Sequence, residues 1–305
     1  MNSSKVKVPF LQGQLAEKYS PVKIVRILLY ALVPAVILLM ALGGMTRVMN
    51  AGLSCPDWPL CFGTLFPEMN LQVFLEWFHR VVATAIGAVT LFLFGFSWWT
   101  RKQLPKGVVF WTGLALGTVL FQGILGGLTV TESLRFDIVT AHLGTATLFL
   151  LILVGLAAAL TPFQANGKKG PLLGFSVIAA VCGYIQVILG GLVASQWALQ
   201  SCMGDGILCQ IMNNHLFGVV PTSLMVLVIG VTAWRMKTYH PKIRGLSLSA
   251  VGLLFLQIIW GVTAFKIQLT APLITVAHLI TGVTLVAILV ALVVFTWRER
   301  HALSA

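Results

Sequence analysis

Long apolar segments separated by short polar ones run along the whole chain. Each is long enough for a transmembrane helix, which needs about 20 mostly apolar residues. Eight such segments can be located, at residues 24–46, 73–97, 107–129, 136–160, 172–194, 211–234, 246–265 and 272–297. The pattern therefore predicts an all-α integral membrane protein with eight transmembrane helices.

The eight segments divide into two similar sets of four. The third, fifth and seventh segments share a motif, read as FQGILGG, IQVILGG and LQIIWG. Each set contains an even number of spans, so both sets begin and end on the same side of the membrane. We therefore predict two tandem four-helix bundle repeats in parallel orientation, at residues 24–160 and 172–297. A cytoplasmic linker at 161–171 would join them, with cytoplasmic tails at 1–23 and 298–305.

The shared motif places a glutamine four residues before a glycine, near the outer end of each helix. The pairs are Gln122 with Gly126, Gln186 with Gly190, and Gln257 with Gly261. Glycines on a membrane helix let a neighbouring backbone come close. At these positions they serve either close helix packing or clearance for a flat ligand.

Composition supports the membrane assignment and orients the chain. Hydrophobic residues make up 58% of it and charged residues only 9%, against about a quarter charged in soluble domains. The net charge is +12, yet all but four of the 20 Lys and Arg lie before or at the start of the first segment or after an even-numbered one. By the positive-inside rule both termini are cytoplasmic, so this charge indicates topology rather than nucleic-acid binding. With no cleavable signal expected in the polar first 20 residues, we predict a multi-pass protein of a prokaryotic plasma membrane.

Four histidines lie at similar depth in the even-numbered segments. His79 and His142 are 63 residues apart, and so are His215 and His278. Ionisable side chains at membrane depth are costly and usually face the bundle interior, where they mark a site. Paired imidazoles without accompanying thiolates or carboxylates suit haem iron held on both axial sides, whereas zinc usually takes three or four protein ligands. We predict two bis-histidine haem sites toward the outer face of the membrane.

The two histidine pairs differ in their neighbours. Glu76 lies three residues before His79 and therefore on the same helical face, whereas Met212 holds the matching position in the second half. An acid in only one half suggests that one site has chemistry that the other lacks. The alternative is that Glu76 forms an ion pair near the membrane interface with Arg80 or Arg47.

Three arginines are expected on the outer side, near the level of the histidines. They are Arg47, Arg80 and Arg135. The guanidinium group matches the geometry of a carboxylate. We expect this cluster to neutralise haem propionates.

The cysteines are concentrated in the outer loops as two close pairs. Cys55 pairs with Cys61 in sequence, and Cys202 with Cys209. An oxidising outer face permits a disulfide in each pair. Such bonds would either staple the loops or have a redox role. Cys182, inside the fifth segment, is expected to be a buried thiol.

Two sequence runs resemble the signature of haem A synthases. They are GGMTRVMNAGLSCPDWPLCFG at residues 43–63 and EWFHR at residues 76–80. The eight helices, the spaced histidines and the outer cysteine pairs fit the same family, so the resemblance covers nearly the whole chain. It implies an oxidoreductase that converts a methyl group of haem O into the formyl group of haem A, with oxygen from water, for cytochrome oxidase assembly.

The resemblance also implies a role for each candidate residue. Glu76 would be the catalytic carboxylate, His79 and His142 would bind the substrate haem, and His215 and His278 would bind a resident haem b that relays electrons. The implied partners are haem O, membrane lipid and the haem O synthase that supplies the substrate, and a homo-oligomer is compatible with the family. No nicotinamide, flavin or iron–sulfur motif identifies the electron acceptor.

Two other functions are compatible with four intramembrane histidines. A di-haem cytochrome b that only transfers electrons would also hold two bis-histidine haems. It would not explain why Glu76 occurs on one side only, nor the CPDWPLC loop. A proton-coupled transporter could use the histidines as a relay, and it would bind no chromophore.

Overall fold

The computed structural model describes residues 20–165, 170–195, 206–267 and 271–301. Within these residues it contains eight helices that are long and apolar enough to cross a membrane. They are α2 (Pro21–Val48), α3 (Leu71–Trp99), α4 (Val108–Thr131), α5 (Phe136–Leu160), α6 (Leu172–Ser195), α8 (Ile207–Arg235), α9 (Pro241–Lys266) and α10 (Pro272–His301), with a short 3-10 helix η1 (Arg101–Gln103) after α3. The predicted all-α fold with eight spans is confirmed.

Local sequence signals set where the helices begin. The side chains of Ser20 and Asn70 accept backbone hydrogen bonds from the first turns of α2 and α3, which satisfies N–H groups that have no partner inside the helix. The largest difference from the predicted bounds is at α9, which begins at Pro241 rather than 246. Proline is favoured in a first helical turn, and the ring of His240 accepts a hydrogen bond from the backbone there. Hydropathy alone does not detect this first turn, because its residues are mostly polar.

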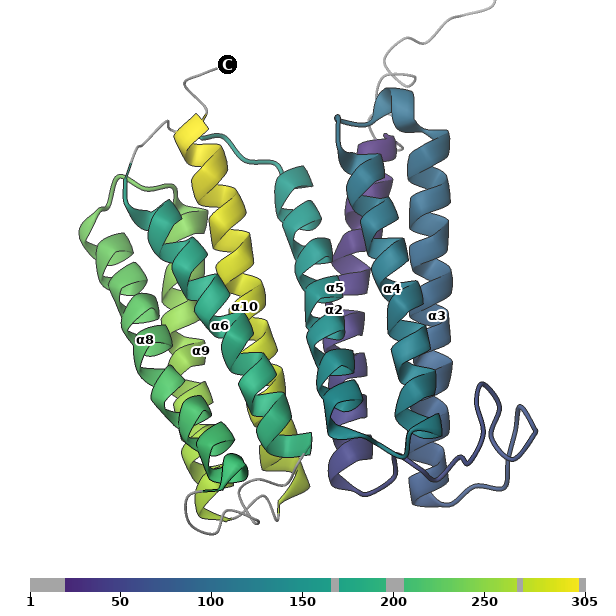
Figure 1. The fold of residues 1–305 in the computed structure, drawn as a ribbon. Coiled ribbons are helices and arrows are strands. Elements are labelled where there is room, and N and C mark those ends of the chain that lie inside the picture. Colours follow the sequence, from purple (N-terminus) through teal and green to yellow (C-terminus); the bar gives the residue numbers. More distant parts are fainter. Residues whose placement is uncertain (1–19, 166–169, 196–205, 268–270, 302–305) are drawn as a thin grey trace, which may run out of the picture.

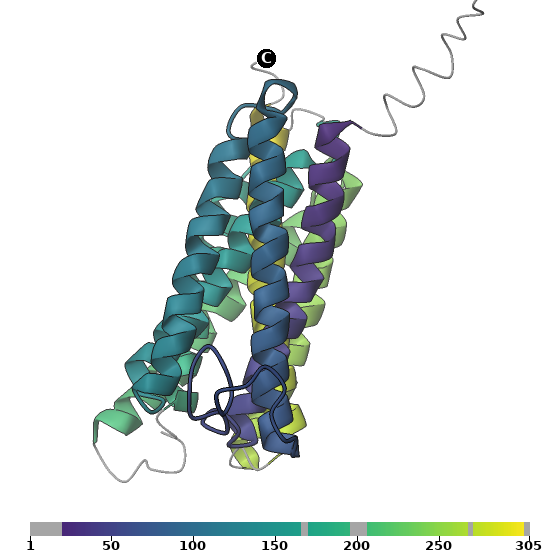
Figure 2. The ribbon, with the colours of Figure 1, turned by 90° about the vertical axis from the view of Figure 1, so that its right-hand side faces the viewer.

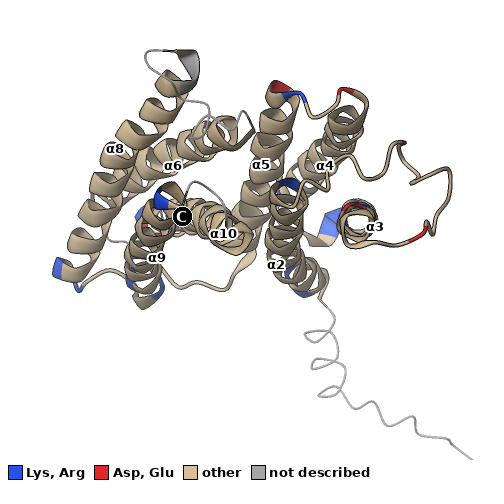
Figure 3. Ribbon diagram, turned by 90° about the horizontal axis from the view of Figure 1, so that it is seen from below, with Lys and Arg blue, Asp and Glu red and all other residues tan. Residues whose placement is uncertain are grey.

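The helices pack as two rings of four, seen along their axes in Figure 3. In the first ring the neighbours follow the order α2, α3, α4, α5, and α5 closes on α2. In the second ring the order is α6, α8, α9, α10, and α10 closes on α6. The helices that carry histidines therefore stand diagonally across each ring, α3 from α5 and α8 from α10. The two rings meet where α10 packs on α2 and α5, and where α5 packs on α6.

The helices α5 and α10 form the centre of the molecule, as Figure 1 shows. About half of each span is buried, 56% for α5 and 50% for α10, against 17–28% for the other six. Leu150 and Leu153 on α5 and Leu289 and Leu292 on α10 are fully buried. Large apolar side chains cover the outward faces of the peripheral helices, as expected where lipid tails are the solvent.

The start of α2 and the end of α10 lie at the same end of the bundle, at the top of Figure 1. The loop formed by residues 49–70 lies at the opposite end, in front of α3 in Figure 2. A disulfide joins Cys55 to Cys61 within this loop, with a Cα–Cα distance of 4.7 Å, so the first predicted disulfide is confirmed. Cys209 is also disulfide-bonded, but Cys202 lies outside the described residues. Cys182 is a free, half-buried thiol.

Candidate active site

His215 and His278 face each other across the second ring. Their ring centroids are 6.4 Å apart and the ring planes are nearly perpendicular, at 88°. Two metal–imidazole bonds of about 2 Å each, together with the half-widths of two rings, span about 6 Å. The separation therefore suits one iron ion held between the two imidazoles. Nδ1 of His278 lies 3.2 Å from the backbone carbonyl oxygen of Gln257, a contact that orients a metal-binding histidine.

His79 on α3 and His142 on α5 occupy the corresponding places in the first ring. Both histidine residues are half-buried, while the Nδ1 atom of each imidazole is buried without a hydrogen-bond partner. Among the described residues, no group of three or more His, Cys, Asp and Glu forms a potential metal site. Two imidazoles per site are the donor set of a bis-histidine haem.

A glycine on the neighbouring helix lies against each of the four histidine rings. A methyl group added at the glycine would lie 2.8–3.3 Å from Cε1 of the ring in every case. The pairs are Gly43 with His79, Gly126 with His142, Gly190 with His215, and Gly261 with His278. The glycines of the repeated motif thus provide clearance for the histidine rings themselves, a use that the sequence analysis did not foresee.

The glutamines of the motif lie beside the histidine helices. The side-chain amide of Gln122 donates to the backbone oxygen of His142 at 2.9 Å, and that of Gln257 lies 3.3 Å from Nε2 of His278. Gln186 packs so closely on Gly218 that a methyl group there would overlap it. All three amide oxygens are buried without a hydrogen-bond partner. The bundle interior therefore keeps unused acceptors near the histidines.

Glu76 is buried and fixed by two groups. Its Oε1 atom forms an ion pair with Arg80 at 2.6 Å, and its Oε2 atom accepts a hydrogen bond from the backbone N–H of Cys55 at 2.8 Å. The exposed fraction of its side chain is 6%. The structure thus contains the ion pair with Arg80 that was the alternative expectation for Glu76.

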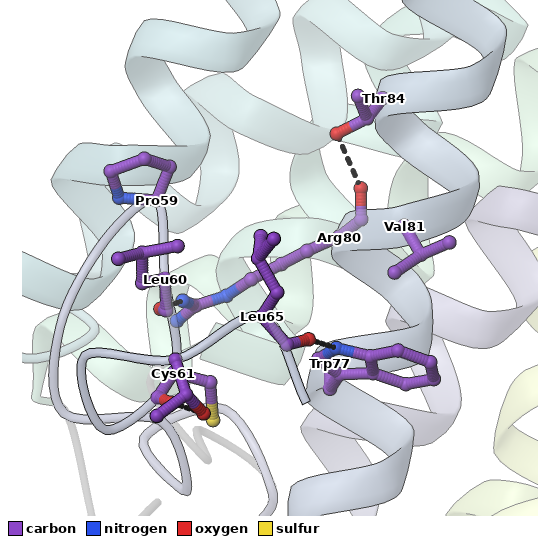
Figure 4. Close-up of a pocket in the computed structure, with 9 residues that line it drawn as sticks. Pro59, Leu60, Cys61, Leu65, Trp77, Arg80, Val81 and Thr84 are labelled. Carbon is purple, nitrogen blue, oxygen red and sulfur yellow. Dashed lines mark hydrogen bonds between the residues drawn. The ribbon is translucent and has the colours of Figure 1, made fainter. Parts of the chain in front are cut away.

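Arg80 also holds the loop of residues 49–70 (Figure 4). Its guanidinium donates to the backbone oxygens of Asp57 at 2.6 Å, Leu60 at 2.5 Å and Cys55 at 3.3 Å. The loop and α3 line a small, partly open pocket of about 220 Å³, whose wall includes Arg80, Trp77, two threonines and several apolar side chains. These loop carbonyls are site residues that the sequence analysis missed, because backbone acceptors leave no signal in a sequence.

The three arginines expected as one cluster have different partners. Arg80 is engaged by Glu76 and the loop. Arg47 donates to the backbone oxygen of Ser195 at 3.2 Å, across the junction of the two rings. Arg135 is more than half exposed and forms ion pairs with Glu132 and Asp137, which raise its pKa. The interaction of these three arginines with haem propionates stays a prediction.

Sequence comparison with known proteins identifies the family of this chain. A sequence model of the COX15-CtaA family, described as cytochrome oxidase assembly protein, matches residues 26–217. A protein from Shewanella oneidensis named heme A synthase is 27% identical over 88% of this chain and 95% of its own length. Proteins of the same name from Shouchella clausii and Halalkalibacterium halodurans are 25% and 27% identical, over 67% and 65% of this chain and 74% and 71% of their own lengths. The chain therefore belongs to the haem A synthase family of cytochrome oxidase assembly proteins.

Proposed function

We propose that this protein is a haem A synthase, which oxidises a methyl group of haem O to the formyl group of haem A. Its family and the name shared by its relatives support this activity. One observation carries the assignment to a site: among the residues that the structure describes, a buried acid, Glu76, lies next to the histidine pair of the first helix ring, and the second pair has no equivalent.

The substrate haem O binds between His79 and His142, and a resident haem b binds between His215 and His278. The chemistry of the donor set and the room left by the glycines support both assignments. The ring separation of 6.4 Å between His215 and His278 supports the second. When bound, haem b supplies a carrier that accepts one electron at a time.

Conversion of the methyl group to the aldehyde takes oxygen from water. Each of two oxidations releases two electrons and two protons, first giving an alcohol and then a hydrated aldehyde that loses water. The protons need an acceptor near the reacting carbon. Glu76, which lies 2.6 Å from Arg80 in an ion pair, is the residue that can act as this general base.

The orientation in the membrane follows from the charge distribution. We place both termini in the cytoplasm and both histidine pairs toward the outer face of a prokaryotic plasma membrane. Residues 24–160 then form the substrate bundle and residues 172–297 the haem b bundle. The matching packing orders of the two rings support this division.

Identification of the bound haem tests the proposal. The protein is expressed with a source of haem O and purified in detergent, and its non-covalently bound haem is extracted and identified by chromatography and mass. Haem A or its hydroxylated precursor is expected beside haem B. Haem B alone, at two per chain, would instead define an electron-transfer cytochrome.

Two matched variants test the division of the sites. His79→Ala should lose haem O and its products but keep haem B, whereas His215→Ala should lose haem B. Loss of the same haem from both variants would contradict the two-site assignment.

A further inference from the structure

Three pairs of consecutive glycines lie at the level of the histidines, and two of them belong to helices at the junction of the two helix rings. These two are Gly43 and Gly44 in α2 and Gly190 and Gly191 in α6. The first glycine of each pair faces a histidine of its own ring: a methyl group on it would lie 2.9 Å from His79 or 3.2 Å from His215. The two pairs are therefore equivalent within their rings.

The second glycine of each pair faces the other ring. A methyl group on Gly44 would lie 2.8 Å from Cδ2 of Leu279 on α10, and one on Gly191 would lie 2.9 Å from Cδ2 of Leu143 on α5. Each of these leucines directly follows a histidine in sequence, Leu279 after His278 and Leu143 after His142. The secondary contacts also match, since Val276 and Thr140, each two residues before the histidine, lie 3.6 Å away.

These contacts make two short links between the histidine pairs. One runs from the imidazole of His79 through Gly43 and Gly44 to Leu279 and His278. The other runs from the imidazole of His215 through Gly190 and Gly191 to Leu143 and His142. Each link begins where an imidazole lies against the first glycine, and it crosses to the other bundle where the second glycine meets the leucine and its neighbour Val276 or Thr140.

The corresponding positions on the other two odd-numbered spans have different neighbours, so the contact with a leucine of the opposite helix ring is found on α2 and α6. On α4, Gly127 follows the His142-facing glycine and packs on Trp58 of the outer loop. On α9, Val262 occupies the same position and is half exposed on the outer surface of the ring.

We propose that Leu279 and Leu143 are positioning residues. Each holds the adjacent histidine in register with a glycine pair of the opposite ring, so that each bis-histidine site is oriented partly by the other bundle. This inference rests on the proposed function for the identity of the bound haem. Close packing alone would also bring the rings together, but it would not link a substitution in one bundle to the haem of the other.

Gly44→Ala tests the link across the rings. The variant is purified with its resident haem b, and the low-spin electron paramagnetic resonance signal of that haem is recorded. The added methyl group displaces Leu279, so the g-values of the haem held by His215 and His278 should shift although the substitution lies in the first bundle. The double variant Gly44→Ala/Leu279→Val removes the Cδ2 methyl that the new group meets and should restore the wild-type signal.

Gly117→Ala is the matched control. Gly117 lies in α4 of the same bundle, and nothing lies within 4 Å of an added methyl group, so its signal should equal that of the wild type. A wild-type signal in Gly44→Ala would overturn the inference. If Gly44→Ala fails to fold, Leu279→Met perturbs the same contact with little change of volume, and an unshifted signal there has the same meaning. A signal that survives His215→Ala would instead refute the haem assignment and so the proposed function.

Discussion

Arg80→Met removes the guanidinium that joins Glu76 to the loop of residues 49–70. Methionine keeps the apolar stem but loses the ion pair at 2.6 Å and the hydrogen bonds to three loop carbonyl oxygens. The carboxylate of Glu76 then retains only the backbone N–H of Cys55. The loop should open more often, and the acid should lose its fixed position.

The magnitude follows from burial. The exposed fractions are 14% for the Arg80 side chain and 6% for Glu76. Breaking a buried pair by removing one partner costs about 3–5 kcal/mol, because a charge is left buried without compensation. Since about 1.4 kcal/mol is a factor of ten, the open population of the loop should rise about a hundredfold or more. Arg80→Met/Glu76→Leu leaves no buried charge and should cost less than Arg80→Met, but the loop should still open more often than in the wild type, because the Cys55 N–H and the three loop carbonyls lose their partners.

Hydrogen–deuterium exchange of peptides from residues 49–70 measures this opening. The control is Arg135→Met, because Arg135 forms its ion pairs at the surface with 55% of its side chain exposed, where a pair contributes about 0–1 kcal/mol. Exchange in the loop should accelerate in Arg80→Met and stay unchanged in Arg135→Met. Wild-type exchange in Arg80→Met would refute the conclusion that the guanidinium holds the loop.

Three further predictions concern the same region. Glu76→Gln should keep haem binding but stop turnover or accumulate the alcohol, as read by mass of the extracted haem; full aldehyde yield would exclude Glu76 as the base. Replacing Cys55 and Cys61 with Ser should cost about 2 kcal/mol of stability for so short a loop and leave haem A yield intact, whereas loss of yield at full stability would indicate a redox role. Hydrogen bonds from the backbone N–H groups of Gly63 and Phe62 lower the pKa of Asp57 from its usual 3.8. The stabilisation of the loop by these two hydrogen bonds is therefore complete above pH 3.8 and is lost as the pH falls through the lowered pKa of Asp57. Pepsin should then cleave the wild-type loop faster in strong acid. In Asp57→Asn, which has no carboxyl group at this position, the cleavage rate should not depend on this titration.

The eight spans and the matched histidines could be predicted from the sequence because their signals are local. Hydropathy marks a span by itself, and a histidine at membrane depth is costly enough to mark a site. The N-cap at Asn70 and the start of α9 at Pro241 also have local sequence signals, a capping side chain and a proline in the first turn. Hydropathy alone predicted the start of α9 five residues too far along the chain, at residue 246.

The neighbours across helices could not be predicted in the same way. Spans that are apolar on all sides give no clue to which face meets protein and which meets lipid, because both are equally apolar. The contact of Gly44 with Leu279 and that of Gly191 with Leu143 depend on this choice of face. The same holds for Arg80, whose partners are mostly backbone oxygens of the loop.

The position of α10 has a consequence for biogenesis. It follows the other described helices in the chain, yet it packs on α2, the first of them, and on α5 and α6 at the junction. Chains generally fold from the N-terminus as they are made, so the face of α2 and α5 that α10 covers stays in contact with lipid until α10 has been inserted. A chain truncated before Pro272 would therefore leave α2 and α5 without the helix that packs on both of them. The first helix ring would then be an incompletely packed substrate for membrane proteases rather than a stable half of the protein.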